Sequence, residues 1–326
     1  MRGPLFVTGC PRSGTTLLLD VLQGHSCVEP IIGETQYWES VYAYRRSLGT
    51  PTSPSARQFL GRYLATRTQQ KEAWQVLDIE EWQQRLAALT DVDYVSSYAE
   101  LMRLFAEKSL GGSLPDDCYP GTKNPKDLYY ASFLTQAFPS CRVVNIVRDP
   151  RAVVASILNG PVGPDNLDDA ALLWRYFAEL GRQHARRLPV DQFLTIRYED
   201  LVADVPGMAQ RLCSFLDLPG EEQMGLEVSR IHSSFGGGKA GSVDPSRAER
   251  YRKVLSSEQI QRIESLVGSE LEGNGYETVA TPAGDRRTSS LKSKARYQWL
   301  KSRLDIKRSV DLGGIKGLLK PGVVRS

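Results

Sequence analysis

Hydrophobic runs followed by amphipathic stretches are the clearest pattern in this chain. Residues 5–8 form a short apolar run that ends at Gly9, and residues 15–23 then carry apolar side chains at helical spacing. Such a run predicts a buried strand, and such a spacing predicts a helix. This stretch therefore predicts a strand, a glycine-containing loop and a helix, in that order.

The same order recurs twice further along the chain. Residues 142–147 predict a strand that breaks at 148–150 before a helix over 151–158, and residues 193–196 predict a strand before a helical stretch at 200–216. Buried parallel strands read as continuous apolar runs with helices between them. The pattern predicts an α/β fold with a parallel sheet and helices on both of its faces.

Two mostly helical insertions, at about residues 45–110 and 165–190, interrupt this alternation, and we expect them to form a helical cap. A turn-rich stretch at residues 281–284 marks a boundary, because the charge changes there. Residues 286–326 contain 12 lysines and arginines and two aspartates, whereas the rest of the chain contains 29 basic and 36 acidic residues. The sequence predicts a folded domain over residues 1–284 and a basic extension over 285–326.

The composition is that of a globular protein. The 326 residues are 41% hydrophobic and 24% charged, which excludes a disordered or collagen-like chain. No apolar run approaches the length of a membrane-spanning helix, and a predicted strand follows Met1 almost at once. Five cysteines are scattered without a C-x-x-C pair, so neither a disulfide framework nor a structural zinc site is indicated. We expect a soluble, cytoplasmic protein in a reducing compartment.

Residues 9–16, with the sequence G-C-P-R-S-G-T-T, follow the first strand and open the first helix. Consecutive backbone N–H groups and the positive end of a helix form an anion site at such a junction. A nucleoside triphosphate loop would read G-x-x-x-x-G-K-S/T, whereas here Thr15 takes the lysine position and Arg12 supplies the cation. The segment predicts a P-loop-type phosphate-binding loop and disfavours ATP or GTP hydrolysis.

This loop and residues 147–156, with the sequence V-R-D-P-R-A-V-V-A-S, resemble sulfotransferases that use 3′-phosphoadenosine 5′-phosphosulfate (PAPS). The motifs are most similar to those of the tyrosylprotein and carbohydrate types, and the resemblance covers about residues 3–276. It implies transfer of a sulfuryl group from PAPS to a hydroxyl, with release of adenosine 3′,5′-bisphosphate (PAP).

The resemblance also implies how the nucleotide is bound. The 5′-phosphosulfate would be held by Arg12, Ser13, Gly14, Thr15 and Thr16, and the 3′-phosphate by Arg148 and Ser156. A guanidinium pairs bidentately with phosphate, which agrees with this assignment. The alternative for Arg148 is a surface ion pair with Asp149.

Two later segments also resemble parts of this family. Tyr198, in the sequence R-Y-E-D-L after the third predicted strand, is expected near the nucleotide or at the sheet end, and an ordinary half-buried tyrosine is the alternative. A glycine-rich stretch at residues 236–256 is similar to the loop that closes over the nucleotide, which implies contacts from Lys239 and Ser242. Tyr251 stands where many relatives carry tryptophan.

Sulfuryl transfer needs a base that takes the acceptor proton. Glu34, in the sequence G-E-T-Q-Y-W, resembles the catalytic glutamate of tyrosylprotein and glycosaminoglycan sulfotransferases, and the alternative is a solvated loop carboxylate. Small-molecule sulfotransferases use histidine, and His25 at the end of the first predicted helix is the second candidate. A helix-end histidine that interacts with the dipole is the simpler interpretation of His25.

The reaction also needs a cation that stabilises charge on the departing phosphate oxygen. Lys123, in the sequence G-T-K-N-P, resembles the K-x-P element that places a lysine beside the bridging oxygen. Pro125 biases Asn124 toward extended geometry, and Lys126 is an alternative cation. No carboxylate and histidine cluster appears at metal-ligand spacing, so we expect an in-line transfer that uses no metal, with Glu34, Lys123 and Arg12 as catalytic residues.

Two other function classes are kept as alternatives. A P-loop nucleotide kinase or NTPase is disfavoured by Thr15, and a non-catalytic PAP-binding adaptor would use the basic extension to contact an acidic partner. The acceptor is not indicated and could be a sugar, phenol, lipid or natural product. The basic extension carries no recognised nucleic-acid motif. It either packs on the acidic body, stays disordered, or lies on an anionic membrane surface.

Overall fold

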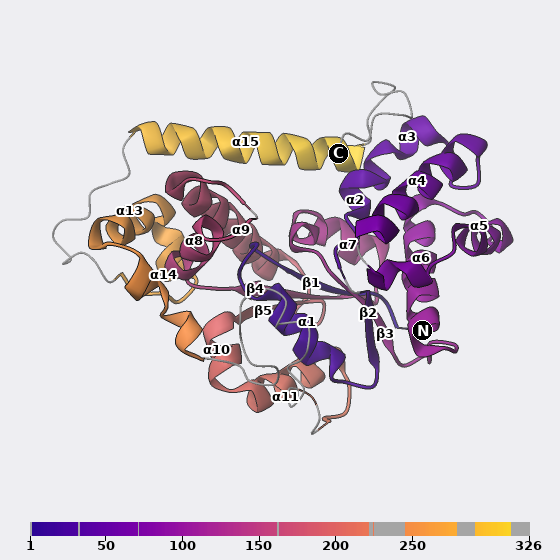
Figure 1. Ribbon diagram of the computed structural model, residues 1–326, viewed down its shortest axis with the longest axis horizontal. Coiled ribbons are helices and arrows are strands. Elements are labelled where there is room, and N and C mark those ends of the chain that lie inside the picture. The colour runs from indigo at the N-terminus through magenta and orange to yellow at the C-terminus, as the bar shows by residue number, and fades with distance from the viewer. Residues whose placement is uncertain are drawn as a thin grey trace. The chain divides into compact units, whose positions relative to one another are not determined.

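The computed structural model describes residues 2–31, 33–70, 72–161, 163–221, 224, 245–278 and 291–313. Five strands form an all-parallel sheet in the order β2-β3-β1-β4-β5 (Figure 1). They are β1 (Leu5–Gly9), β2 (Val28–Ile31), β3 (Tyr119–Lys123), β4 (Arg142–Val147) and β5 (Phe193–Arg197). The predicted α/β fold with a parallel sheet is therefore confirmed.

The chain divides into two compact units. Unit 1 comprises residues 1–6, 26–141 and 305–326, and unit 2 comprises residues 7–25 and 142–304. The main helices of unit 1 are α2 (Tyr37–Ser40), α3 (Arg45–Leu48), α4 (Pro54–Gln70), α5 (Ile79–Ala88), α6 (Tyr94–Leu110) and α7 (Ala131–Ala137). Those of unit 2 are α1 (Thr15–Gln23), α8 (Pro150–Leu158), α9 (Leu167–Arg187), α10 (Tyr198–Ala203), α11 (Val205–Leu216), α12 (Tyr251–Val254), α13 (Ser257–Val267) and α14 (Ser269–Gly273), with α15 (Leu291–Gly313) belonging mostly to this unit.

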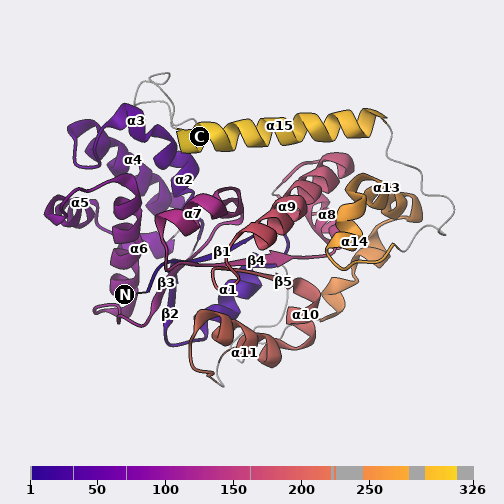
Figure 2. The ribbon, with the colours of Figure 1, turned by 180° about the vertical axis from the view of Figure 1, so that it is seen from behind.

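Unit 2 has helices on both faces of its strands. Helices α8, α9 and α13 pack together on one side of β4 and β5, and α1, α10 and α11 lie on the other side (Figures 1 and 2). The two strands pair in parallel from Val143 opposite Phe193 to Val147 opposite Arg197. The apolar residues of β4 are buried, as expected for a strand covered on both faces. The insertion predicted at 165–190 is thus a helix, α9, that covers β5 within this unit.

Unit 1 contains the other predicted helical insertion. The stretch predicted to be mostly helical consists chiefly of α4, α5 and α6. Helix α6 packs on β2 and β3. The core is aromatic: Trp38 and Tyr98 are fully buried with ring centroids 4.6 Å apart. Aspartates at helix starts fix the boundaries, because Asp78 caps α5 and Asp93 forms a capping box with Ser96 at α6.

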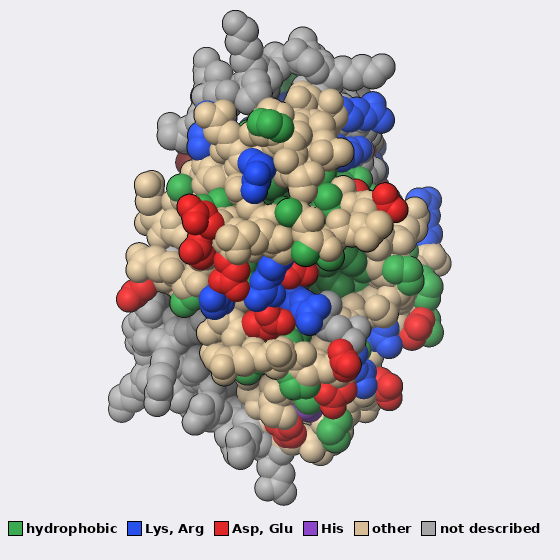
Figure 3. Space-filling model, turned by 90° about the vertical axis from the view of Figure 1, so that its right-hand side faces the viewer, with side chains coloured by type: hydrophobic (Ala, Val, Ile, Leu, Met, Phe, Trp, Pro, Cys, Tyr) green, Lys and Arg blue, Asp and Glu red, His purple; other side chains and the backbone are tan. Residues whose placement is uncertain are grey.

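Charged residues of both signs alternate on the outer face of α5 and α6, the side of the molecule that Figure 3 shows. Arg85 pairs with Glu81, Glu100 and Glu107 at 3.0, 3.2 and 2.7 Å. Lys108 adds a contact of 2.6 Å with Glu81. These ion pairs link the exposed sides of α5 and α6.

Helix α15 shows where the described part of the basic extension lies. Arg296 pairs with Asp169 of α9 at 2.7 Å, and Lys301 and the Tyr297 hydroxyl both contact Glu179 of the same helix. Tyr297 is buried, while Trp299 is exposed. The residues 294–301 therefore pack on acidic side chains of unit 2, as one of the alternatives expected. The predicted boundary at residue 284 lies outside the described residues.

Within the described residues, no helix is both long and apolar enough to cross a lipid bilayer.

Candidate active site

The loop at residues 9–16 has the backbone of an anion cradle. Gly9, Arg12 and Gly14 have φ values of 147°, 71° and 97°, and the Ser13 N–H donates to the carbonyl oxygen of Cys10 at 3.0 Å. These left-handed positions reverse the chain between β1 and α1, so that the first turn of α1 directly follows the loop. Arg12 is not a glycine, and its strained backbone is typical of a functional loop.

Gly14 is required by its contact with Tyr198. A Cβ atom on Gly14 would lie 2.5 Å from Cδ2 of Tyr198, which is closer than two carbon atoms can approach. Tyr198 begins α10 immediately after β5 and is buried. The tyrosine predicted near the nucleotide or the sheet end therefore lies against the phosphate loop.

Both predicted phosphate-binding segments meet in unit 2. Arg12 Nε donates to Ser156 Oγ at 3.0 Å, and Arg148 Nη1 donates to the carbonyl oxygen of Arg12 at 3.3 Å. The Arg148 guanidinium also stacks on the Tyr198 ring, 4.1 Å from the centroid, and donates to the carbonyl oxygen of Arg247 at 2.7 Å. Arg148 is thus held from three sides beside the loop.

Asp149 does not pair with Arg148, which was the alternative interpretation of this arginine. Asp149 caps α8 and pairs with Arg151 at 2.6 Å. Arg151 also reaches Glu264 of α13 at 2.6 Å and is buried. The second arginine of the R-D-P-R sequence therefore anchors α8 to α13, and the first is left for a ligand.

The electrostatics of this cluster fit a phosphate. Burial lowers the pKa of Arg12, and nearby Arg148 lowers it further. Neither guanidinium has a carboxylate partner within the described ranges. Ser13 Oγ and Arg148 Nε are buried and meet no hydrogen-bond partner among the residues that the structure describes. Two adjacent cations with spare donors are stabilised by an anion, so the residues present fit the phosphates of a nucleotide.

Glu34 and Lys123 form a pair in unit 1. Lys123 Nζ donates to Glu34 Oε1 at 3.1 Å. Lys123 is the last residue of β3 and Glu34 follows the end of β2, whose Ile31 lies opposite Thr122 in the parallel register. The side chain of Glu34 is 36% exposed and that of Lys123 14% exposed. The predicted base and cation are thus in contact, with the carboxylate open to solvent.

A buried carboxyl next to this pair was missed by sequence reasoning. Asn124 has the extended backbone predicted from Pro125, and its Nδ2 donates to Asp127 Oδ1 at 2.8 Å. Asp127 is fully buried, which raises its pKa well above the usual range, and the charges of Glu39 and Glu34 raise it further, against the Asn124 hydrogen bond. The sequence N-P-K-D could have indicated a helix start at Pro125, capped by Asn124, that brings Asp127 next to the cap.

His25, the second candidate base, is buried and engaged at both ring nitrogens. Nε2 lies 2.9 Å from the carbonyl oxygen of Pro219, and Nδ1 lies 3.6 Å from Glu221 Oε1. The residue follows the end of α1, whereas the phosphate loop precedes its start. These contacts link α1 to the segment after α11 and leave His25 no free nitrogen for an acceptor.

The remaining predicted residues are more peripheral or outside the described part of the chain. Lys126, the alternative cation, lies 3.7 Å from Glu39 and is about half exposed. Lys239 and Ser242 lie outside the described residues. Tyr251 is buried against α8 and stacks under Arg151, which gives it a packing role.

Each candidate segment directly follows the carboxyl end of a strand. The phosphate loop follows β1, Glu34 follows β2, Lys123 ends β3, Arg148 follows β4 and Tyr198 follows β5. In open parallel α/β sheets, ligands bind at the carboxyl ends of strands. The candidate residues therefore stand at the positions where open parallel α/β sheets bind ligands.

Comparison with known proteins agrees with this arrangement. The family model described as "Sulfotransferase family" matches residues 4–222. A protein-tyrosine sulfotransferase of Drosophila melanogaster is 24% identical over 270 residues, which are 81% of this chain and 47% of that protein. Protein-tyrosine sulfotransferase 1 of Danio rerio is 25% identical over 271 residues, 81% of this chain and 65% of that protein. The chain thus spans about half the length of the first of these relatives.

Two solved structures share the fold. The sulfotransferase domain from the Synechococcus PCC 7002 olefin synthase has a TM-score of 0.52 and 21% identity, and covers 82% of this chain and 96% of that domain. The sulfotransferase domain from the curacin biosynthetic pathway has a TM-score of 0.53 and 19% identity, and covers 86% of this chain and 99% of that domain.

Proposed function

The chain belongs to the sulfotransferase family, and on that premise we propose that it transfers a sulfuryl group from PAPS to a hydroxyl of an acceptor and releases PAP. The observation that carries this proposal is the cluster of Arg12, Arg148 and Ser156 around the loop. Two neighbouring guanidinium groups that have no carboxylate partner among the described residues, beside a helix start and a lysine-free loop, suit a bisphosphate better than a magnesium triphosphate.

The residues of the loop bind and orient the nucleotide in this proposal. Arg12, Ser13, Gly14, Thr15 and Thr16 hold the 5′-phosphosulfate, and Arg148 and Ser156 hold the 3′-phosphate. PAPS supplies an activated sulfuryl group. Arg12 and the backbone N–H groups at the start of α1 stabilise negative charge on phosphate oxygens, since they are fixed before the reaction begins.

Glu34 acts as the general base in this proposal, and Lys123 stabilises the charge on the departing phosphate oxygen. Glu34 takes the proton of the acceptor hydroxyl, and its partly exposed carboxylate supports this role. Lys123 donates to the departing phosphate oxygen. Its contact with Glu34 supports a shared task, because the ammonium holds the carboxylate in place until the acceptor arrives. The buried His25, with both nitrogens engaged, is a weaker candidate for the base.

The acceptor is a hydroxyl compound of unidentified structure. Two of the relatives are named protein-tyrosine sulfotransferases, which supports a phenolic hydroxyl as one class to test beside sugars, lipids and natural products. The reaction needs no metal in this proposal, because the arginines and lysine supply the positive charge.

The basic extension is proposed to act within the protein before any external partner. Arg296, Lys301 and Tyr297 are engaged by α9, which supports packing on the acidic body. Contact of the exposed Trp299 face with an anionic membrane or an acidic partner remains a secondary proposal, as does a cytoplasmic location.

Ligand-induced protection against thermal unfolding tests the nucleotide part of the proposal. PAP should raise the unfolding temperature far more than Mg-ATP at equal concentration, because a ligand at 100 times its dissociation constant contributes about 2.7 kcal/mol. Incubation with sulfur-labelled PAPS and a panel of phenols, sugars and lipids then tests transfer. Stronger protection by Mg-ATP would contradict the sulfotransferase proposal, and PAP binding without transfer to any acceptor would favour an adaptor.

A further inference from the structure

Two cysteines meet at the amino ends of β2 and β3 in unit 1, at the end of these strands opposite to Glu34 and Lys123. Cys27 directly precedes β2, and Cys118 directly precedes β3. The Tyr119 N–H donates to the carbonyl oxygen of Cys27 at 2.8 Å, which extends the register that places Val28 opposite Tyr119. The strand pairing therefore aligns the two cysteines side by side.

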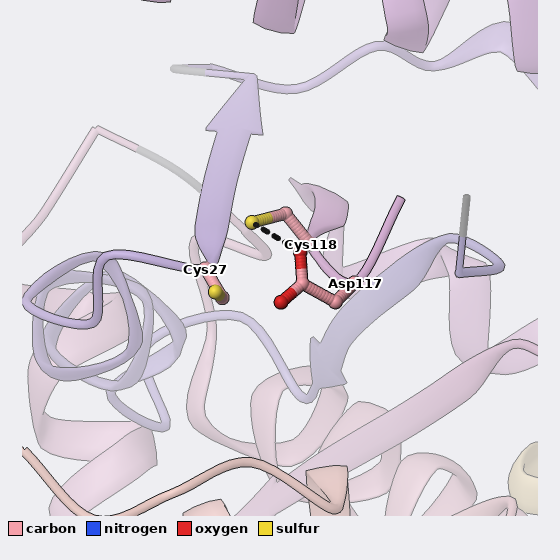
Figure 4. A group of neighbouring side chains, drawn as sticks. All are labelled: Cys27, Asp117 and Cys118. Carbon is pink, nitrogen blue, oxygen red and sulfur yellow. Dashed lines mark hydrogen bonds between the residues drawn. The ribbon is translucent and has the colours of Figure 1, made fainter. Parts of the chain in front are cut away.

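A third donor points into the same place. One atom each from Cys27, Asp117 and Cys118, two sulfurs and a carboxylate oxygen, all lie within 4.8 Å of one another (Figure 4). Cys118 Sγ lies 3.8 Å from Asp117 Oδ1. Cys118 is buried, Cys27 is half-buried and Asp117 is exposed, so the group opens to solvent on the carboxylate side. No disulfide bond joins any of the five cysteines, all of which lie in the described part of the chain.

We propose that Cys27, Cys118 and Asp117 bind a thiophilic divalent cation of the zinc type, with a water molecule as the fourth ligand. Zinc prefers tetrahedral sites of thiolate, imidazole and carboxylate ligands. Two sulfurs at about 2.3 Å from such an ion lie about 3.8 Å apart. The three donor atoms already lie within 4.8 Å, so small side-chain rotations complete the site.

The carboxylate decides between a metal ion and a disulfide bond. A disulfide would use the two sulfurs alone, would need a disulfide or similar oxidant, and would give Asp117 no role. A divalent cation uses all three donors, and the two thiolates and the carboxylate more than neutralise its charge. Binding releases the two thiol protons to solvent, because cysteine coordinates zinc as thiolate. Cys27 is far from Asp117 and Cys118 in sequence, so no spacing motif indicates the site.

The place of the site in the fold gives the ion a structural role. β2 is an edge strand of four residues that contains Pro30, which cannot donate to a strand ladder. An ion that joins the residues before β2 and β3 fixes the pairing of these two strands. Their other ends carry Glu34 and Lys123, so the ion stabilises the strands that position this pair without contacting it. The inference does not depend on the identity of the acceptor or on the nucleotide.

Metal titration of the full chain tests this proposal. Untagged, reduced protein freed of metal by a chelator is titrated with zinc against a chromogenic chelator, and in parallel with cobalt(II). We expect one tight equivalent per chain, thiolate-to-cobalt charge-transfer absorption, and a higher unfolding temperature with zinc. Cys27→Ser and Cys118→Ser should each lose the tight site and the absorption, and Asp117→Asn should weaken binding by about tenfold or more while it keeps the thiolate absorption.

Cys213→Ser is the matched control, because Cys213 is also buried but lies in unit 2, outside the group. It should bind zinc as the unchanged protein does. Far-UV circular dichroism and cooperative thermal unfolding of each metal-free variant show that each is folded. The proposal is overturned if the unchanged protein shows no thiolate-to-cobalt absorption, or if Cys27→Ser and Cys118→Ser bind zinc as tightly as it does. A Cys27–Cys118 disulfide formed with oxidised glutathione, in protein that binds no zinc when reduced, would also overturn it and identify a redox pair.

Discussion

Arg12 donates from Nε to the Oγ of Ser156 over 3.0 Å, although 144 residues separate them in sequence. The two residues come from the two motifs that the family resemblance assigns to different phosphates of the nucleotide. Their contact, with Arg148 bound to the carbonyl oxygen of Arg12, joins both motifs into one cationic cluster. A substitution in either motif is therefore expected to affect nucleotide binding.

Arg148→Ala should weaken PAP more than a nucleotide that lacks the 3′-phosphate. Hydrogen bonds to charged groups contribute about 1.5–3 kcal/mol, so the affinity for PAP should fall about 10- to 150-fold. Isothermal titration of PAP and of the analogue measures both. Arg211→Ala, an exposed arginine on α11, is the control and should bind both nucleotides normally. Equal losses for the two nucleotides would remove Arg148 from the 3′-phosphate site.

Glu34→Gln should abolish most turnover and leave PAP binding nearly unchanged, because glutamine keeps the shape of the side chain and removes the base. Loss of a general base typically costs about 10²–10⁴-fold in rate. Transfer of labelled sulfate measures the rate, and Glu72→Gln, at an exposed glutamate of unit 1, is the control. His25→Ala should instead lower stability. An inactive His25→Ala beside an active Glu34→Gln would assign the base to His25.

Lys123→Met should lower turnover far more than Lys126→Met. Lys123 is mostly buried, and its Nζ lies 3.1 Å from Glu34 Oε1. Lys126 is about half exposed, and its Nζ lies at the longer distance of 3.7 Å from Glu39 Oε1. The loss of the donor to the departing oxygen should reduce the rate at saturating nucleotide by about 10²–10³-fold. Steady-state kinetics with both variants measure the difference. The opposite order of effects would make Lys126 the cation.

Asp127→Asn should change the pH dependence of stability. Burial raises the pKa of Asp127 in the folded chain above its unfolded value, so the folded state keeps a proton that the unfolded state releases. This contribution to the free energy of unfolding is fully present below the unfolded pKa and is lost as pH rises toward the folded pKa. The asparagine variant has no such loss, and it should gain stability over the unchanged protein as pH rises.

Urea unfolding at about pH 5 and about pH 8 measures this effect. Asp91→Asn is the control, because Asp91 is exposed and its left-handed backbone suits asparagine. Its free energy of unfolding should change with pH in the same way as that of the unchanged protein. An Asp127→Asn variant whose advantage over the unchanged protein is the same at both pH values would show that the Asp127 carboxyl is ionised when buried.

Tyr297→Ala should detach α15 from α9 and lower the free energy of unfolding by up to about 3 kcal/mol. Tyr297 is 2% exposed and stacks under Arg175, whereas Trp299, two residues on, is 59% exposed. Trp299→Ala should therefore leave stability unchanged. A chain ending at Gly284 should resemble Tyr297→Ala in stability and still bind PAP. If it does not bind PAP, the predicted domain boundary is wrong.

Binding to anionic vesicles separates the roles of the extension. If the exposed face of α15 contacts a membrane, Trp299→Ala should weaken binding to the vesicles, and added salt should weaken this binding as well. Vesicle binding that survives removal of residues 285–326 would exclude the extension as an anchor.

The elements found from sequence are those whose patterns are strong. β1, β4 and β5 are short apolar runs, and α1 and α8 begin and end within one residue of the predicted bounds, while α9 lies within the helical insertion predicted at about 165–190. The strands β2 and β3 were missed, because their sequences V-E-P-I and Y-P-G-T-K contain proline and glycine, which are depleted in strands. Pairing with a neighbour, rather than local preference, makes these segments extended.

The helix predicted over residues 200–216 is two helices. Pro206 lacks a backbone N–H, and the side chain of Asp204 accepts from the Gly207 N–H, so a new helix begins there. The site residues were found where a motif carries them. Asp127, Glu39 and the Cys27 group were missed, because their proximity arises from strand pairing and packing that no local spacing records.

The three contacts of Arg148 have a consequence for the speed and specificity of nucleotide capture. A free arginine side chain must be immobilised when it grips a ligand, at about 0.5–1.5 kcal/mol. The Arg148 side chain stacks on Tyr198 and donates to the carbonyl oxygens of Arg12 and Arg247, so it is already immobilised in the folded protein. The guanidinium still has its Nε–H to offer. In the proposed site this guanidinium is therefore already ordered before a nucleotide binds, whereas a lysine at this position, which lacks the planar guanidinium, would have to be ordered at each binding event.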